Sequence, residues 1–242
     1  MNILNEEAEH IRAELRHYFV DSSQECPYGL AFQARYRQAA FGTLPDFIMD
    51  AYLAAGYRRN GNVIYTMRCP ECRACIPLRI APEAFKPNRI QKRTWRRNRD
   101  VTVEVAPLAC REENLALLDK FLRGRYPGRD SSALSYYSNF FLNRLTTSLE
   151  FRYRVGSQLI GVAIVDLAPT WLNAVFFYFD PAEGKRSPGV YNILNLIDFC
   201  RGKDIKFIYL GYWIKDLPAM NYKTNFSPHS LYLNNSWKFI DC

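Results

Sequence analysis

The sequence predicts a mixed α/β (α+β) fold in two parts, residues 1–105 and 106–242. The first part alternates segments of helical spacing with short β-rich runs, and it holds a cluster of cysteines. From residue 150 the pattern changes to three β-rich runs that are followed by a loop, a helix and a strand. No Pro- or Ser-rich linker separates the two parts. We therefore expect the cysteine-containing N-terminal region to pack on the C-terminal domain.

Composition places the chain among soluble folded proteins. Of 242 residues, 48% are hydrophobic and 15% aromatic, which supplies a core and excludes the disordered and low-complexity classes. No run approaches the roughly 18 apolar residues that span a bilayer. Glu6, Glu7 and Glu9 stand where a secretory signal needs an apolar stretch. We expect a cytoplasmic protein with no membrane partner.

The N-terminal part begins with two predicted helices. Residues 5–16 carry apolar side chains at helical spacing, and residues 44–57 repeat them more regularly, at i, i+3 and i+4. Gly56 is a typical C-terminal stop for the second helix. Two β-rich runs, 62–68 and 76–80, then flank the cysteines and predict strands.

A basic helix is predicted next, and the stretch that contains it, residues 86–99, holds nearly all of the charge excess. The chain has 32 Lys and Arg against 24 Asp and Glu, and seven of the basic residues lie within 86–99, where no acidic residue occurs. Without this stretch the balance is 25 to 24. Five of the seven repeat at i, i+3, i+4, i+7 and i+8, which places them on one helix face; the opposite face (Gln91, Thr94, Asn98) is also polar, so we expect no core contact for it. A concentrated positive patch beside Trp95 favours contact with nucleic acid over a merely solvated face.

The C-terminal part is predicted from its run of elements. Residues 101–105 alternate as a strand and lead into helices over 112–122 and 136–145. The later elements are strands over 151–155, 159–167 and 172–179, a loop over 180–189, a helix over 190–200 and a strand over 206–212. This order is typical of a mixed α/β domain of acyltransferase type.

Three cysteines form a knuckle, Cys69-x-x-Cys72-x-x-Cys75. A tetrahedral Zn²⁺ or an iron–sulfur cluster takes four ligands, and Cys26 is the natural fourth. The second Cys-x-x-Cys of an ordinary zinc ribbon is missing. The alternative is a group of reduced cysteines with a structural role.

The segment Lys185 to Gly189 joins a strand to a helix. The N–H groups at the start of that helix are suited to hold a phosphate or an oxyanion. No Ser/His/Asp set or paired-carboxylate spacing stands out. An acyl transfer that requires only the orientation of two bound substrates fits the sequence better than covalent catalysis.

The chain resembles the aminoacyl-tRNA–protein transferases, which comprise eukaryotic arginyltransferases and bacterial leucyltransferases. The N-terminal resemblance lies in Cys26-Pro27-Tyr28, in residues 56–61, in Tyr65, in the cysteine run 69–80, in residues 85–89 and in Arg96-Arg97-Asn98. The C-terminal resemblance lies in residues 179–181, Arg186-Ser187, Gly189, Tyr191, residues 209–214, Met220, Tyr222-Lys223 and Phe226. The match runs in order from about residue 17 to residue 229.

The resemblance implies an acetyltransferase-like (GNAT-type) C-terminal domain and an enzyme that uses aminoacyl-tRNA. The amino acid, leucine in preference to arginine, goes to the N-terminal α-amine of proteins that begin with Asp or Glu and marks them for degradation. Direct aminolysis of the tRNA ester needs no cofactor. The family's metal or iron–sulfur site carries over to the four cysteines named above.

Candidate site residues follow from the resemblance and from the charge pattern. The expected catalytic residues are Tyr178, Asp180, Arg186 and Tyr212. The expected substrate-binding residues are Arg58, Arg59, Lys185, Ser187 and Gly189. The expected tRNA-binding residues are Lys86, Arg89, Lys92, Arg93, Arg96 and Arg97.

Two other functions stay open. An N-acetyltransferase predicts tight binding of coenzyme A and no use for the basic helix. A non-catalytic relative, a metal-knuckle module that binds tRNA or other RNA, predicts tRNA binding without turnover. Pro188 and Ala219, which depart from the family's pattern, are the reason for the second alternative.

Overall fold

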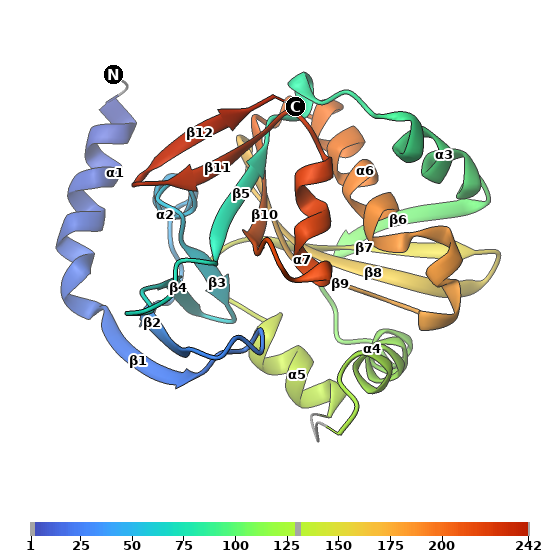
Figure 1. The fold of residues 1–242 in the computed structure, drawn as a ribbon, viewed down its shortest axis with the longest axis horizontal. Helices are drawn as coiled ribbons and strands as arrows, with labels where there is room; N and C mark the ends of the chain where they lie inside the picture. Colours follow the sequence, from blue (N-terminus) through green and yellow to red (C-terminus); the bar gives the residue numbers. More distant parts are fainter. Residues whose placement is uncertain (1–2, 129–131, 242) are drawn as a thin grey trace. The chain divides into compact units, whose positions relative to one another are not determined.

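A computed structural model describes residues 3–128 and 132–241 of the chain (Figure 1). The chain divides into two compact units, each assembled from separate segments. The first unit comprises residues 1–80, 144–146 and 209–242, and the second comprises 81–143 and 147–208. The boundary predicted near residue 105 falls inside the second unit. The mixed α/β class is confirmed.

The first unit combines helices and strands from both ends of the chain. Its N-terminal elements are α1 (Ile3–Glu14), a 3-10 turn (Leu15–Tyr18), β1 (Val20–Glu25), β2 (Gln33–Ala40), α2 (Asp46–Ala54), β3 (Arg58–Asn60), β4 (Val63–Met67) and β5 (Ile76–Ile80). Its C-terminal elements are most of β10 (Phe207–Trp213), α7 (Pro218–Asn221), a 3-10 turn (Tyr222–Asn225), β11 (His229–Leu233) and β12 (Ser236–Ile240).

Two groups of strands shape this unit. Antiparallel pairing gives a four-stranded sheet in the order β1-β2-β4-β3. A second group follows the order β12-β11-β5-β10. The apolar face of α2 supplies the core, where Ile48, Met49 and Tyr52 are fully buried, and α1 packs against α2. The aromatic ring of Tyr52 also contacts Phe19, with 5.7 Å between the ring centroids.

The second unit is a continuous stretch apart from residues 144–146. Its elements are a 3-10 turn (Pro82–Ala84), α3 (Arg89–Arg97), β6 (Val101–Pro107), α4 (Glu112–Arg125), α5 (Ala133–Phe140), β7 (Ser148–Val155), β8 (Gln158–Leu167), β9 (Trp171–Phe179), a 3-10 turn (Pro181–Arg186) and α6 (Pro188–Arg201). The strands pair antiparallel in the order β9-β8-β7-β6.

Helices cover both faces of this sheet. Side chains of α4 and α5 form one apolar cluster with Val162, Ile164 and Tyr178 of β8 and β9. On the other face the ring of Phe151 contacts Phe199 of α6, with centroids 4.9 Å apart. Strand β8 is therefore buried on both sides, which explains its nearly unbroken apolar sequence.

Most of the predicted elements are confirmed, with shifted ends. Helix α5 spans 133–140 instead of the predicted 136–145, because Ser132 caps it by accepting a hydrogen bond from the Ser135 N–H at 3.1 Å. The predicted loop over 180–189 holds a 3-10 turn. Among the described residues, no helix is both long and apolar enough to cross a membrane.

Candidate functional site

A deep cavity in the first unit is strongly positive. It has a volume of about 1260 Å³, and its wall carries several guanidinium groups and a single carboxylate, that of Asp21. The arginines are Arg12, Arg16, Arg35, Arg37, Arg68 and Arg73. We call this feature the arginine cavity. Its charge suits an anionic ligand.

The strand pairing explains how these arginines come together. Arg35 and Arg37 are two residues apart on β2, so they project from the same face of the sheet. Arg68 follows β4, the neighbouring strand, and its N–H donates to the Arg35 carbonyl at 2.7 Å. The sequence analysis missed this set because it predicted no strand over 33–40.

Only part of this positive charge is neutralised. The Arg12 guanidinium pairs with the Glu9 carboxylate at 2.7 Å, and that of Arg37 lies 3.5 Å from Asp21. Arg16, Arg35 and Arg68 are exposed, and none of them pairs with a carboxylate among the described residues. Three guanidinium groups are thus available to an incoming anion.

Tyr212 lines the same cavity from strand β10 and is otherwise buried. Its backbone carbonyl accepts a hydrogen bond from the Lys223 amine at 2.8 Å. Burial, and then the nearby charge of Arg58, lower the pKa of Lys223 to about 7. Sequence reasoning missed Lys223 as a perturbed group, although it belongs to the Tyr-Lys pair that carries the family resemblance.

Arg58 and Arg59 of β3 are buried and do not line the arginine cavity. A side chain at Gly211 would place its Cβ 3.1 Å from an Arg58 nitrogen, and the φ of Gly211 is +80°. Glycine at this position therefore lets the Arg58 guanidinium approach the backbone of β10. The charge of Arg58 also acts to lower the pKa of Tyr212, although burial outweighs it, so Arg58 lies near this residue of the cavity wall.

The three knuckle cysteines, Cys69, Cys72 and Cys75, also line the arginine cavity. Burial, followed by the proximity of Cys69, Cys26 and Cys72, raises the pKa of the Cys75 thiol to about 12. The other three cysteines are therefore close enough to Cys75 to act on its thiol. Among the described residues, however, no three His, Cys, Asp or Glu side chains are arranged to hold a metal ion. The metal site therefore stays a prediction.

The predicted basic helix is α3. A capping box fixes its start: the Asn88 side chain accepts from the Gln91 N–H at 2.9 Å, and the Gln91 side chain accepts from the Asn88 N–H at 2.8 Å. The six residues expected to bind tRNA are all exposed: Lys86, Arg89, Lys92, Arg93, Arg96 and Arg97. We call this set the basic face.

The opposite side of α3 corrects one expectation. Gln91, Thr94 and Asn98 are buried, although their polarity predicted no core contact. The Asn98 amide donates to the carbonyls of Thr94 and Arg186, both at 2.9 Å. The polar side chains are satisfied by hydrogen bonds, so α3 packs on α6 and turns its charges outward.

Arg186 is held by two carboxylates. Its guanidinium forms a bidentate pair with Asp100, with both contacts at 2.8 Å, and its Nε lies 2.6 Å from a Glu183 oxygen. Lys185 is exposed beside it, and the Lys185 carbonyl accepts a hydrogen bond from Arg97. The positive charge of Arg186 is thus largely matched by Glu183 of the same loop and by Asp100, which lies between α3 and β6.

The start of α6 offers fewer free backbone N–H donors for a phosphate or an oxyanion than the sequence suggested. Ser187 takes a left-handed conformation with φ 55°, and Pro188 supplies no N–H. The N–H groups of Val190 and Tyr191 both donate to the Ser187 carbonyl at 3.0 Å. Gly189 lies in this first turn and is half-buried.

Tyr178 and Asp180, both expected to be catalytic, have structural partners. Tyr178 is fully buried, its ring stacks on Phe141 with centroids 6.0 Å apart, and burial raises its pKa. The Asp180 carboxylate pairs with Lys120 at 2.7 Å and accepts from the Ala182 N–H at 2.9 Å. Burial alone would raise the pKa of Asp180, but these two contacts outweigh it and lower the pKa. Among the described residues, no hydrogen bond or ion pair joins Tyr178, Asp180 and Arg186 into one cluster.

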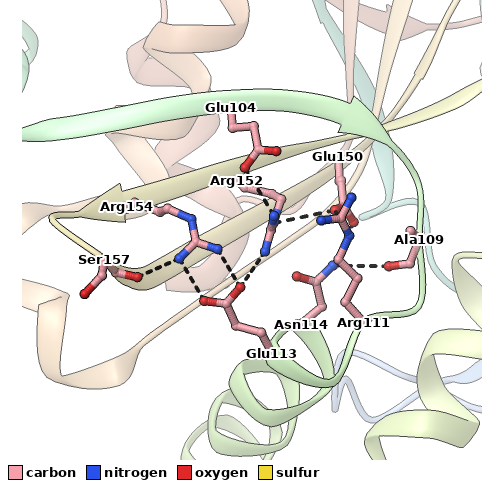
Figure 2. A network of polar contacts seen from close by, with 9 residues as sticks. All are labelled: Glu104, Ala109, Arg111, Glu113, Asn114, Glu150, Arg152, Arg154 and Ser157. Carbon is pink, nitrogen blue, oxygen red and sulfur yellow. Dashed lines mark hydrogen bonds and ion pairs between the residues drawn. The ribbon is translucent and has the colours of Figure 1, made fainter.

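A second polar network lies at the sheet edge where β7 meets α4 (Figure 2). The Glu150 carboxylate is completely buried; it accepts a hydrogen bond from the Asn114 amide at 2.7 Å and lies 3.6 Å from the Arg152 guanidinium. Arg152 continues to Glu113 at 2.5 Å, which also pairs with Arg154 at 2.5 Å. Burial raises the pKa of Glu150. This network was missed, because alternating charges on a strand normally indicate a solvated face.

Comparisons with known proteins agree with the resemblance. A family model described as "Arginine-tRNA-protein transferase, N terminus" matches residues 24–93, and its C-terminus counterpart matches residues 113–233. The aspartate/glutamate leucyltransferase of Hahella chejuensis is 38% identical over 197 residues, which are 79% of this chain and 84% of that protein. The protein of the same name from Thiobacillus denitrificans is 32% identical over 231 residues, 93% of this chain and 95% of the relative.

Similarity to solved structures is more distant. The C-terminal domain of a putative lysylphosphatidylglycerol synthetase from Agrobacterium fabrum has a TM-score of 0.43 and 13% identity, covering 74% of this chain and 55% of that chain. The L-PGS structure from Bacillus licheniformis has a TM-score of 0.41 and 11% identity, covering 69% of this chain and 50% of that one.

Proposed function

The chain belongs to the arginine-tRNA–protein transferase family, and on that premise we propose that it transfers leucine from leucyl-tRNA to proteins that begin with Asp or Glu. It is an aminoacyltransferase. The observation that carries the proposed substrates is the presence of two separate positive features, the arginine cavity and the basic face. A transferase of this kind has two anionic substrates, the tRNA and the acidic N-terminus.

The basic face is the proposed contact for the tRNA backbone. Five of its six cations lie on the exposed side of α3 and Lys86 lies just before the helix, so this surface presents positive charges to several phosphates. The buried polar side of α3 supports this role, because hydrogen bonds of Asn88 and Asn98 hold the helix in place. Of the six cations, Arg97 adds a bond to the Lys185 carbonyl. The phosphate contacts position the tRNA without reading its sequence.

The arginine cavity is the proposed site for the acidic side chain of the acceptor. Arg16, Arg35 and Arg68 are exposed there without a carboxylate partner among the described residues, and guanidinium groups match carboxylates in a bidentate geometry. A neutral N-terminal residue would gain nothing from these charges. Selectivity for Asp and Glu then follows from charge.

The main task of the protein in this reaction is to align its two substrates. The acceptor α-amine attacks the carbonyl carbon of the aminoacyl ester, a C–N bond forms, and the ester C–O bond to the tRNA ribose breaks. The proton lost by the amine balances the one gained by the leaving ribose oxygen. Because the ester is already activated, orientation of the two bound substrates and stabilisation of the oxyanion account for the rate enhancement. No cofactor takes part in this step, which we place in the cytoplasm, where charged tRNA is found.

The order of elements in the second unit supports an acetyltransferase-like fold for the transferase domain. Three consecutive antiparallel strands, β7 to β9, lead through a short loop into α6. The N-acetyltransferase alternative shares this order, so the assay must separate the two activities.

The test is a transfer assay with a matrix of donors and acceptors. Labelled leucyl-tRNA, arginyl-tRNA and acetyl-CoA are each combined with peptides that begin with Asp, Glu or Ala and are otherwise identical. We expect label from leucyl-tRNA on the Asp and Glu peptides and none on the Ala peptide. Label from acetyl-CoA would establish the acetyltransferase, and tRNA binding without any transfer would establish the non-catalytic alternative.

A further inference from the structure

A second cavity lies between α3 and α6, on the flank of the basic face. It has a volume of about 550 Å³, within the range of sites that hold a small organic group. Its floor is apolar, formed by the buried side chains of Leu194 and Ile197 of α6. The indole of Trp95 forms its wall on the α3 side. We call it the Trp95 cavity.

Trp95 is an unusual residue for this position. Its neighbours on the outward side of α3 are charged, yet 39% of Trp95 is exposed. The ring is not loose, because it packs against Tyr191 of α6 with centroids 5.6 Å apart. A fixed and partly exposed aromatic face beside cations is the arrangement on which proteins stack unpaired bases.

The charged groups at the rim of the Trp95 cavity are complementary to those of a nucleotide. Lys92 and Arg96 belong to the basic face and line the cavity, so phosphates on that face would lie next to it. Across from them α6 presents the exposed carboxylate of Asp198. A carboxylate can accept hydrogen bonds from the exocyclic amine of a base.

We propose that the Trp95 cavity binds an unpaired base of the tRNA, stacked on Trp95, while Lys92 and Arg96 contact the adjoining phosphates. This inference rests on the proposed function, since it supposes that tRNA lies along the basic face. An apolar peptide side chain would fill the floor equally well but would leave the cations at the rim without partners. The charge complementarity therefore favours the nucleotide.

The test compares two RNAs and three variants. The RNAs are intact tRNA, which has unpaired bases, and a blunt RNA duplex of similar length, which has none. The variants are Trp95→Ala, Trp95→Phe and Ile90→Ala. Ile90 is a matched control because it is an exposed apolar side chain of the same helix that does not line the cavity.

We expect Trp95→Ala to lower the affinity for tRNA by about 5- to 150-fold, the range seen when one stacked base loses its aromatic partner. Trp95→Phe should retain most of the affinity, and Ile90→Ala all of it. Affinity for the duplex and the salt dependence of tRNA binding should not change, because no phosphate contact is removed. Quenching of intrinsic fluorescence by a single-stranded oligonucleotide should be lost in Trp95→Phe.

Three results would overturn the inference. One is a Trp95→Ala protein that binds tRNA as tightly as the wild type. Another is an equal loss of affinity for tRNA and duplex, which would indicate damage to α3. The third is unchanged RNA binding with a raised KM for the acceptor peptide, which would assign the cavity to a protein segment. If the wild type itself binds no tRNA, the proposed function fails instead.

Discussion

Replacing Arg93 and Arg96 with glutamine tests how the basic face binds tRNA. Both side chains are exposed, and glutamine keeps a similar helix propensity, so α3 should persist. Each protein–phosphate contact contributes about 0.7–0.9 to the slope of log affinity against log salt concentration. The double variant removes two such contacts.

The structure sets the size of the effect. Arg97 already donates to the Lys185 carbonyl, so we count the other five cations of the basic face as phosphate contacts. Arg96 is included because only its Nε is engaged, with the Lys92 carbonyl at 3.4 Å. Five contacts predict a slope of about −3.5 to −4.5, so a fourfold rise in salt weakens wild-type binding roughly 130- to 500-fold. With three contacts left, the slope is about −2.1 to −2.7 and the same rise costs only about 20- to 40-fold.

The assay is equilibrium binding of tRNA across a salt series. Arg123→Gln is the matched control, because Arg123 is 80% exposed on α4 and pairs with Asp119 at 2.9 Å, away from the basic face. Its slope should equal that of the wild type. An unchanged slope in the Arg93 and Arg96 double variant would refute the placement of tRNA on α3.

Three further predictions concern stability. Asp180→Asn should lower the free energy of unfolding by about 1–3 kcal/mol, because it removes a charge-assisted bond to Lys120; Lys120→Met should cost a similar amount, and additive effects in the double variant would contradict this pairing. Because the pKa of Lys223 is lowered to about 7 in the folded state, the unfolded state binds one more proton between pH 7 and the ordinary lysine pKa of 10.5, and the free energy of unfolding should rise with pH over this range. Lys223→Met should remove this rise, measured by urea unfolding. A rise that persists in the variant would show that another group causes it. Gly56→Ala should destabilise by about 1–3 kcal/mol, because φ is +82° and the new Cβ would lie 2.8 Å from the Tyr232 ring; an unchanged urea midpoint would show that the ring moves aside freely.

Sequence periodicity predicted a helix or strand well wherever one side of that element packs against the hydrophobic core. The helix over 44–57 and the strand over 159–167 were evident because their apolar residues are buried, as in α2 and β8. Strands β1 and β2 were missed for the opposite reason. Strand β1 reads VDSSQE and is almost wholly exposed, so its pairing with β2 leaves no apolar alternation to detect.

The two parts of the candidate site also differed in how well the sequence predicted them. The cations of the basic face were predicted individually, because they are close together in the sequence and all but Lys86 lie on one helix. The arginine cavity was not, since Arg16, Arg35 and Arg68 lie on separate elements that only the tertiary structure brings together. Arg58 and Tyr178 illustrate a further limit, because the sequence did not show that both residues are buried; their functional roles stay predictions.

Steady-state kinetics of two variants test most directly the claim that two positive features bind two different substrates. The first variant carries Arg93→Gln and Arg96→Gln, and the second carries Arg35→Gln and Arg68→Gln in the arginine cavity. In leucine transfer to a peptide that begins with Asp, the first variant should raise the KM for leucyl-tRNA and leave that for the peptide unchanged. The second should raise the KM for the peptide and leave that for leucyl-tRNA unchanged. If both variants raise the KM for the same substrate, or if neither alters any, the account is contradicted.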